Sequence, residues 1–189
     1  DVPEFEEVTR IHTPGEVAVS YRPDGGTPVS FTEQNAFVAE QNFFDIFDFK
    51  ATEGNPKEAL ALPGNMVITQ EVATKYFGSK DAIGQTLLVN QGTESRAFKI
   101  EAVLENIPIN SHIQFDMLFS MSSFDHIQQR QHQWIWTTFV TYGLVAEGVD
   151  ISQLEAKIQS IPPKWAEQEI QNVFGQTYEE YIGDKEWTL

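Results

Sequence analysis

The sequence predicts an α+β protein in which one subdomain is inserted into another. Residues 64–90 show the pattern of a strand, a helix, a turn and a second strand, a unit too small to bury its own apolar face. Segments with strand-like alternation of apolar and polar residues lie on both sides of this unit. A packed domain needs a second layer against each apolar face, so the two chain ends are expected to supply it together.

The middle unit begins with the apolar run 66–68, which fits a buried strand. Thr69 follows as the N-cap of a helix, and Gly78 is its stop signal. Four apolar or aromatic residues recur at helical spacing and share one face: Val72, Ala73, Tyr76 and Phe77. A turn then leads to a second strand, in which Leu87 and Val89 point to the same side.

The chain before this unit alternates with period two or carries turn residues. We predict, in order, strands over 4–12 and 17–21, a hairpin turn over 22–28, a strand at 37–38, a helical turn at 43–47, a strand over 49–52 and a connector over 55–64.

The chain after this unit contains the cleanest amphipathic strand, because Phe98, Ile100, Ala102 and Leu104 alternate with polar residues. We then predict a proline-containing corner over 107–112, a strand beginning at 113 and a short helix over 123–129. The segment 139–146 is apolar on both faces, which predicts a strand in the centre of its sheet. A helix from Asp150 to the Pro162-Pro163 pair and a second helix ending at Gly175 complete the chain.

The composition excludes several classes of protein. The formal net charge of −16 repels phosphate backbones, so nucleic acid is not expected as a partner. The chain has no cysteine, which excludes disulfides, thiolate catalysis and cysteine-based zinc sites. No apolar run approaches the roughly 18 residues of a membrane span. Because the chain starts at Asp1 without an initiator methionine or a signal-peptide pattern, we expect it to be a processed or excised piece.

Residues with chemical potential do not form a recognisable catalytic or metal-binding motif. Nucleotide-binding and hydrolase motifs such as GxxxxGK[ST], GxGxxG, GxSxG and HExxH do not occur. His126 and His132 are spaced for no common zinc site, and His112 is expected to bond backbone at its proline-containing corner. The carboxylate clusters at 4–7 and 179–180 fit solvated surface. We therefore predict no catalytic residues, no metal and no cofactor.

Trp134 and Trp136 are the candidate partner interface. Two tryptophans at i and i+2 often belong to one face of a strand that packs on the core. Exposed aromatic residues are also typical of protein interfaces, which gives the pair a second interpretation.

Three stretches resemble one known family. The stretch ITQEVATKYFGSKDAIGQTL (68–87) resembles a hallmark segment of the extracytoplasmic core domain of MacB/FtsX-type ABC transporter permeases. NFFDIFDFKATEGNPKEAL (42–60) and FKIEAVLENIPINSHIQFDMLFS (98–120) resemble the segments that precede and follow it there. They occur in the family's order and at its spacing, and together span about half of the chain. The segments 124–136 and 162–189 do not match the family.

The resemblance implies a fold, a location and a role. The fold would be a discontinuous porter-like subdomain, residues 1–60 and 113–189, with a smaller Sabre-like subdomain, residues 61–112, inserted into it. The domain would lie on the periplasmic or extracellular face of the bacterial inner membrane, between two transmembrane helices. Its partners would be those helices, a second permease copy, a cytoplasmic ATPase and an envelope protein.

The implied role is not enzymatic. Domains of this family couple cytoplasmic ATP hydrolysis to export or release of peptides, including antimicrobial peptides, lipoproteins or similar substrates, by mechanotransmission. The alternative is a secreted hydrolase or carbohydrate-binding module that uses Trp134, Trp136 and surface carboxylates. That alternative predicts a concave pocket with two facing carboxylates, at least one with a raised pKa. Without membrane anchors, the isolated chain is expected to be mostly monomeric.

Overall fold

The computed structural model describes residues 2–23, 25–91, 94–130, 132–135 and 138–183. Its strands are β1 (Phe5–His12), β2 (Val17–Tyr21), β3 (Val29–Glu33), β4 (Ala36–Ala39), β5 (Ala51–Gly54), β6 (Asn65–Thr69), β7 (Thr86–Gln91), β8 (Glu94–Leu104), β9 (Met117–Ser120) and β10 (Phe139–Val145). Its helices are α1 (Phe43–Ile46), α2 (Pro56–Ala59), α3 (Gln70–Phe77), the 3₁₀ turn η1 (Met121–Ser123), α4 (Asp125–Arg130), α5 (Ile151–Gln159), α6 (Ile161–Phe174) and α7 (Tyr178–Ile182).

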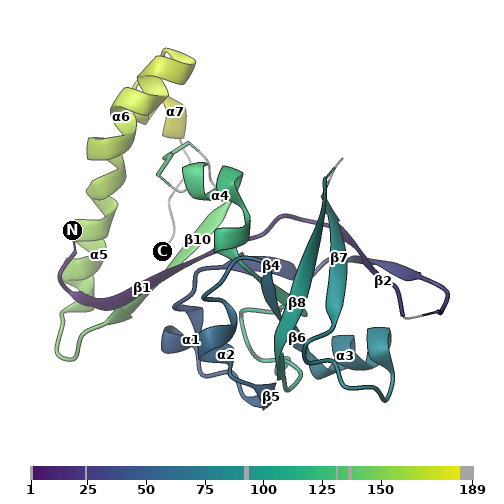
Figure 1. The fold of residues 1–189 in the computed structure, drawn as a ribbon. Coiled ribbons are helices and arrows are strands. Elements are labelled where there is room, and N and C mark those ends of the chain that lie inside the picture. The colour runs from purple at the N-terminus through teal and green to yellow at the C-terminus, as the bar shows by residue number, and fades with distance from the viewer. Residues whose placement is uncertain (1, 24, 92–93, 131, 136–137, 184–189) are drawn as a thin grey trace.

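The described strands form one mixed sheet, which confirms the α+β class. Their order is β10-β1-β4-β9-β6-β8-β7-β2-β3, and β5 pairs with β8 outside this path. Most neighbours are antiparallel, but β4 runs parallel to β9 and β6 runs parallel to β8. Figure 1 shows α3 beside the β6–β8 end, α1 and α2 near β4 and β5, and α5 with α6 as an arm on the β1–β10 side.

Two apolar clusters hold the sheet and its helices together. The first joins α3 and α4 to the inner strands through side chains such as Tyr76, Phe98 and Phe119. The second joins α1 and α2 to the sheet through Phe43, Phe115 and other side chains. Both are rich in phenylalanine, whose rings bury a large apolar area each.

The middle unit folds as the sequence predicts. β6 is buried on both sides, and α3 begins where Thr69 Oγ1 accepts a hydrogen bond from the Val72 N–H at 3.5 Å. The helix ends at Gly78, whose φ of 65° is a left-handed conformation that only glycine adopts easily. Val72, Tyr76 and Phe77 face the core, as their spacing indicates.

A β-bulge in β8 divides its buried side chains between the two clusters. Met66 pairs with Ile100 and Val67 pairs with Ala102, so Glu101 is the extra residue. Phe98, Ile100, Ala102 and Leu104 are all buried, which confirms the predicted alternation. Because of the bulge, however, the first two pack in the first cluster and the last two in the second.

Two predicted boundaries are wrong by a few residues. The strand expected over 49–52 is β5, which starts at Ala51 and ends at Gly54, where an added Cβ would lie 2.1 Å from the Glu101 carbonyl oxygen. The strand expected from 113 is β9, which starts at Met117; Ile113 and Phe115 are buried but precede it. Packing of these aromatic and aliphatic side chains, rather than strand pairing, accounts for their burial.

The prediction of a central strand over 139–146 is wrong. β10 is the terminal strand of the described sheet and pairs with β1 alone. Val140 and Leu144 are accordingly 46% and 41% exposed. An apolar run on both faces is typical of an inner strand, but strand order depends on the whole topology and not on local pattern.

The two C-terminal helices follow each other almost without interruption. α5 is capped by Asp150, whose Oδ1 accepts the Gln153 N–H at 3.2 Å. Ser160 keeps a right-handed helical conformation between α5 and α6. The two prolines therefore lie in the first turn of α6, where a missing N–H removes no helical hydrogen bond.

The subdomain division into 1–60 with 113–189 and 61–112 stays a prediction. The three strands of the proposed insertion, β6, β7 and β8, are contiguous in the sheet and lie between β9 and β2. Within the described residues, no helix has the length and apolar character needed to cross a membrane.

Candidate partner interface

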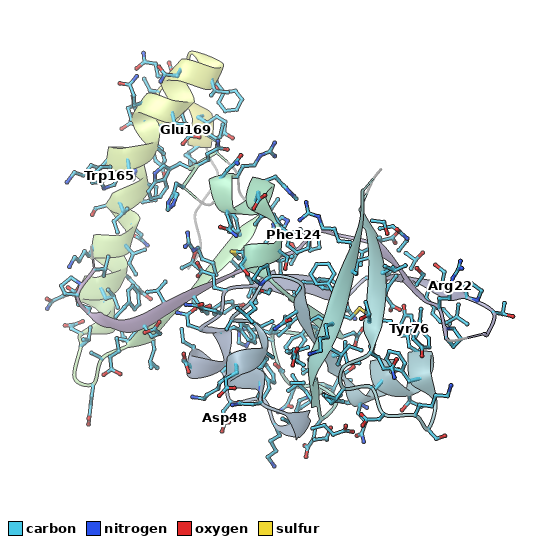
Figure 2. The ribbon with its side chains drawn as sticks, in the orientation of Figure 1. Arg22, Asp48, Tyr76, Phe124, Trp165 and Glu169 are labelled. Carbon is cyan, nitrogen blue, oxygen red and sulfur yellow. The ribbon has the colours of Figure 1, made fainter. Side chains whose placement is uncertain are left out.

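Trp134 lies on the loop between α4 and β10, where it is fixed to α6. Its backbone N–H donates a hydrogen bond to Glu169 Oε2 at 2.8 Å, and its side chain is 40% exposed. Figure 2 labels Glu169 and Trp165 on α6; Trp165 is 60% exposed. Trp136, the other half of the predicted pair, lies outside the described residues. The candidate interface at the two tryptophans thus stays a prediction.

Exposed apolar side chains gather at the end of the molecule that carries Trp134. We call this region, built from β1, β10, the Trp134 loop, α5 and α6, the apolar end. Eight of the twelve large apolar side chains that are exposed among the described residues belong to it: Val8, Trp134, Val140, Leu144, Ile151, Trp165, Val173 and Phe174. These side chains are distributed over the five elements of this end, from β1 to Phe174, the last residue of α6.

The N-terminal carboxylate cluster has structural partners. Glu4 accepts two hydrogen bonds from Lys157 Nζ, at 2.8 and 2.7 Å, which tie the start of the chain to α5. This bond to Lys157 lowers the pKa of Glu4, whereas a general acid needs a raised one. Glu7 accepts a hydrogen bond from the side-chain amide of Asn42.

The second cluster caps a helix. The Glu180 carboxylate accepts the Thr177 N–H at 2.8 Å, and Thr177 Oγ1 accepts the Glu180 N–H at 3.2 Å. This reciprocal pair is a capping box at the start of α7. Neither cluster is therefore a pair of carboxylates facing across a cleft.

Two shallow depressions lie near the start of α3, and they meet at Asn106. The first, of about 480 Å³, is lined by Glu71, Lys75 and neighbouring polar residues. The second, of about 380 Å³, is lined by Asp48 and Glu105 together with Lys50, a cation beside both acids. Trp134 lines neither depression, so these two hollows do not bring the tryptophan and the carboxylates together.

The histidines make local contacts. His12 is buried, and its Nδ1 lies 3.2 Å from the Thr138 carbonyl oxygen. His112 packs against the Tyr142 ring at 5.6 Å between centroids, and His126 meets Phe124 edge-on at 6.0 Å. Over the described ranges, no three His, Asp or Glu side chains are grouped so that they could hold a metal ion.

Comparison with known proteins decides the family. A profile of the MacB-like periplasmic core domain matches residues 1–161, most of the chain. The chain belongs to this family. It is thus an extracytoplasmic domain of a MacB-like ABC transporter permease, on the periplasmic or extracellular face of the membrane. A search of curated protein sequences gave no match.

Solved structures share the fold of this MacB-like domain. A domain from Porphyromonas gingivalis, assigned to a permease, superposes with a TM-score of 0.70 at 22% identity, covering 90% of this chain and 75% of that one. The periplasmic region of MacB from Actinobacillus actinomycetemcomitans superposes with a TM-score of 0.57 at 13% identity, covering 93% of this chain and 70% of that one. The extracellular domain of the noncanonic ABC-type transporter YknZ from Gram-positive bacteria superposes with a TM-score of 0.51 at 13% identity. The superposition covers 93% of this chain and 80% of that one.

This MacB-like domain contains a buried ionic cluster that was not predicted from the sequence. The Glu33 carboxylate, 6% exposed, receives hydrogen bonds from Lys75 Nζ at 2.8 and 2.9 Å and from the Tyr76 hydroxyl at 2.5 Å. Burial, with this hydrogen bond, raises the pKa of Tyr76 above its ordinary value. The cluster joins the edge strand β3 to α3 (Tyr76 is labelled in Figure 2). Glu33 and the Lys75-Tyr76 pair are more than 40 residues apart, so no local pattern pointed to it.

Proposed function

We propose that this domain transmits mechanical change instead of catalysing a reaction. In the parent permease, ATP binding and hydrolysis on a cytoplasmic ATPase would move the transmembrane helices that flank the domain. The domain, paired with a second permease copy and contacting an envelope protein, would carry that motion outward to drive export or release of peptides, lipoproteins or similar substrates. Such a role needs a stiff body joined firmly to its anchors.

The attachment of β1 supports this proposal most directly. β1 is the first element of the chain, yet it lies inside the sheet, paired with β10 over its length and with β4 at Ile11 and His12. A displacement applied before residue 5 would therefore act at once on two neighbouring strands. Packed interiors are close to incompressible, so the displacement would pass into the whole sheet.

Two ion pairs reinforce this attachment. The Glu4–Lys157 pair joins the chain just before β1 to α5. The Arg10–Glu40 pair, with Nη2 and Oε1 2.6 Å apart, joins β1 to the end of β4, and Glu40 also accepts the Arg10 backbone N–H at 2.8 Å. The four side chains are partly buried, at 22% to 40% exposed. One pair lies just before the start of β1 and the other near its end.

The test is to loosen β1 in the parent permease by combining Glu40→Gln with Lys157→Met. We expect ATP hydrolysis to continue while export falls, because the motion no longer reaches the domain. Coupling free energies between sites are about 1–3 kcal/mol, so the expected loss of export is roughly 5- to 150-fold. Export assays and ATPase assays on the same membrane preparations measure the two quantities.

Lys57→Met is the matched control, because it removes a more exposed pair, Lys57–Asp45, that does not involve β1. It should change neither rate. If the β1 variant exports at the normal rate, or loses ATP hydrolysis and export in equal proportion, the proposal is wrong.

A further inference from the structure

The joint between α5 and α6 interrupts the helical hydrogen-bond ladder. A helix is held along its length by bonds from each N–H to the carbonyl group four residues earlier. Pro162 and Pro163 have no N–H, so they cannot donate such bonds to the carbonyl groups of Ile158 and Gln159. The prolines remove no hydrogen bond from within α6, but they also provide none that would tie α6 to α5.

Ser160 closes α5 as a helix of its own. Its N–H lies 3.3 Å from the Ala156 carbonyl oxygen and 3.2 Å from the Lys157 carbonyl oxygen, a shared bond that is common at helix ends. Its hydroxyl group donates to the Lys157 carbonyl oxygen at 2.6 Å. These bonds all run back into α5, so they stabilise the end of that helix without holding α6.

Local preferences give this joint a second backbone conformation. The ring of a proline crowds the residue before it and favours an extended backbone there over a helical one. Ile161 precedes Pro162, and Pro162 precedes Pro163, yet all three belong to the first turn of α6. Sharp bends in helices are found mostly at proline for these reasons. A change at Ser160 and Ile161 would therefore alter the angle between the two helices without breaking a hydrogen bond donated by either proline.

The two helices are attached to different parts of the molecule. α5 is fixed to the start of the chain by the two hydrogen bonds from Lys157 to Glu4, and its Leu154 is buried. α6 is held at Glu169, whose Oε2 accepts the Trp134 N–H at 2.8 Å. Trp134 belongs to the loop between α4 and β10, and Figure 1 shows α6 extending away from the sheet. The attachment of α6 can thus change while α5 stays on β1.

α7 is bound to α6 and would move with it. The Tyr178 N–H donates a hydrogen bond to Glu167 Oε2 at 2.7 Å. The rings of Phe174 and Tyr181 stack with their centroids 4.9 Å apart and their planes inclined by 21°. Because these contacts join the two helices on both sides of the intervening turn, we treat α6 and α7 as one rigid unit, the distal arm.

We propose that residues 160–163 are a hinge about which the distal arm swings relative to α5 and the sheet, and that the Glu169–Trp134 hydrogen bond is the latch of the position in the structure. Gln171 lies roughly ten residues, or about 15 Å, beyond the joint. A change of about 20° in the bend would move it by about 5 Å. The inference does not rest on the proposed function but adds to it, because the domain would be stiff at β1 and jointed at α6.

Distances between pairs of spin labels test the hinge, because the chain has no cysteine of its own to compete for the label. Thr86→Cys places one label on the inner strand β7, at an exposed position. The second label goes either on α5, at Ser152→Cys, or on α6, at Gln171→Cys, both of which are exposed. Double electron–electron resonance should give a narrow distance distribution for α5. For α6 we expect a distribution that is broader, or has a second maximum displaced by about 5 Å.

Two substitutions act on the hinge and on its latch. Pro162→Ala combined with Pro163→Ala restores both N–H groups and should narrow the α6 distribution to the width of the α5 distribution. Pro56→Ala, in the first turn of α2, is the matched control and should leave the α6 distribution unchanged. Glu169→Ala removes the acceptor of the latch and should increase the displaced population, whereas Glu155→Ala, at an exposed position of α5, should not. Unfolding midpoints establish that the variants are folded.

An α6 distribution as narrow as that of α5 in the chain that carries only the label sites would overturn the proposal, and this comparison needs no further variant. So would a broad α6 distribution that the two alanines leave unchanged, since the motion would then arise elsewhere, or one that Glu169→Ala does not alter. Because these distances are measured without transport, this test can fail while the export test succeeds, and the reverse.

Discussion

At the scale of single residues, the buried His12 makes the stability of this domain depend on pH. His12, at the end of β1, is buried against Phe139, with ring centroids 5.5 Å apart, and is close to the Thr138 carbonyl oxygen. Burial is the main cause that lowers the pKa of His12, the nearby His126 adds to it, and the bond to Thr138 opposes it. The folded protein thus favours the neutral imidazole more than the unfolded chain does.

This lowered pKa predicts a pH dependence of stability. As the pH falls below about 6.5, the ordinary value for histidine, the unfolded chain takes up a proton that folded His12 resists, so the free energy of unfolding decreases. The decrease ends once the pH is below the folded pKa. Urea unfolding at a series of pH values between about 7 and 5 measures this slope, and we expect His12→Gln to reduce it.

His132→Gln is the control for that series, because it removes a histidine that is exposed instead of buried. A slope that is equally steep in His12→Gln would show that other groups cause the pH dependence. Glu4, whose pKa is lowered, contributes at lower pH, where protonation of its carboxylate removes the Lys157 pair.

At the scale of elements, α3 is the helix that local signals define most completely. Its N-cap, apolar face and glycine stop all lie within ten residues, and each has the predicted role. β8 and β10 show the opposite case. The bulge at Glu101 and the terminal place of β10 both depend on partner strands that are distant in the sequence.

The N-cap of α3 gives a prediction about stability. Thr69→Ala removes the acceptor for the Val72 N–H and should lower the free energy of unfolding by about 1 kcal/mol. Denaturant unfolding measures the change. Thr69→Ser keeps the hydroxyl group and should restore most of the lost stability. Because Thr69 is buried, its methyl group also contributes to packing. A serine variant as unstable as the alanine variant would therefore show that the methyl group, and not the cap, causes the loss.

At the scale of the whole molecule, continuity of the sheet governs cooperativity. The predicted insertion, residues 61–112, contributes β6, β7 and β8, which are hydrogen-bonded to strands on both sides. We therefore expect a single unfolding transition for the sheet. Leu88→Trp places a fluorescent reporter at an exposed position of β7. The fluorescence of this variant minus that of the unsubstituted chain should show the same unfolding midpoint as far-ultraviolet circular dichroism. Two separate midpoints would show that the insertion unfolds independently of the remaining sheet.

The sequence by itself determined the α+β class, the middle strand–helix–strand unit, the caps of α3 and α5 and the family resemblance, because each depends on residues close together in the chain. Tertiary structure alone decided the strand order, the edge position of β10, the bulge that divides the side chains of β8, and the burial of Glu33 against Lys75 and Tyr76. These features depend on contacts between distant segments. Hydrophobic periodicity records which side chains are buried, but it does not record which strand or charge lies beside them.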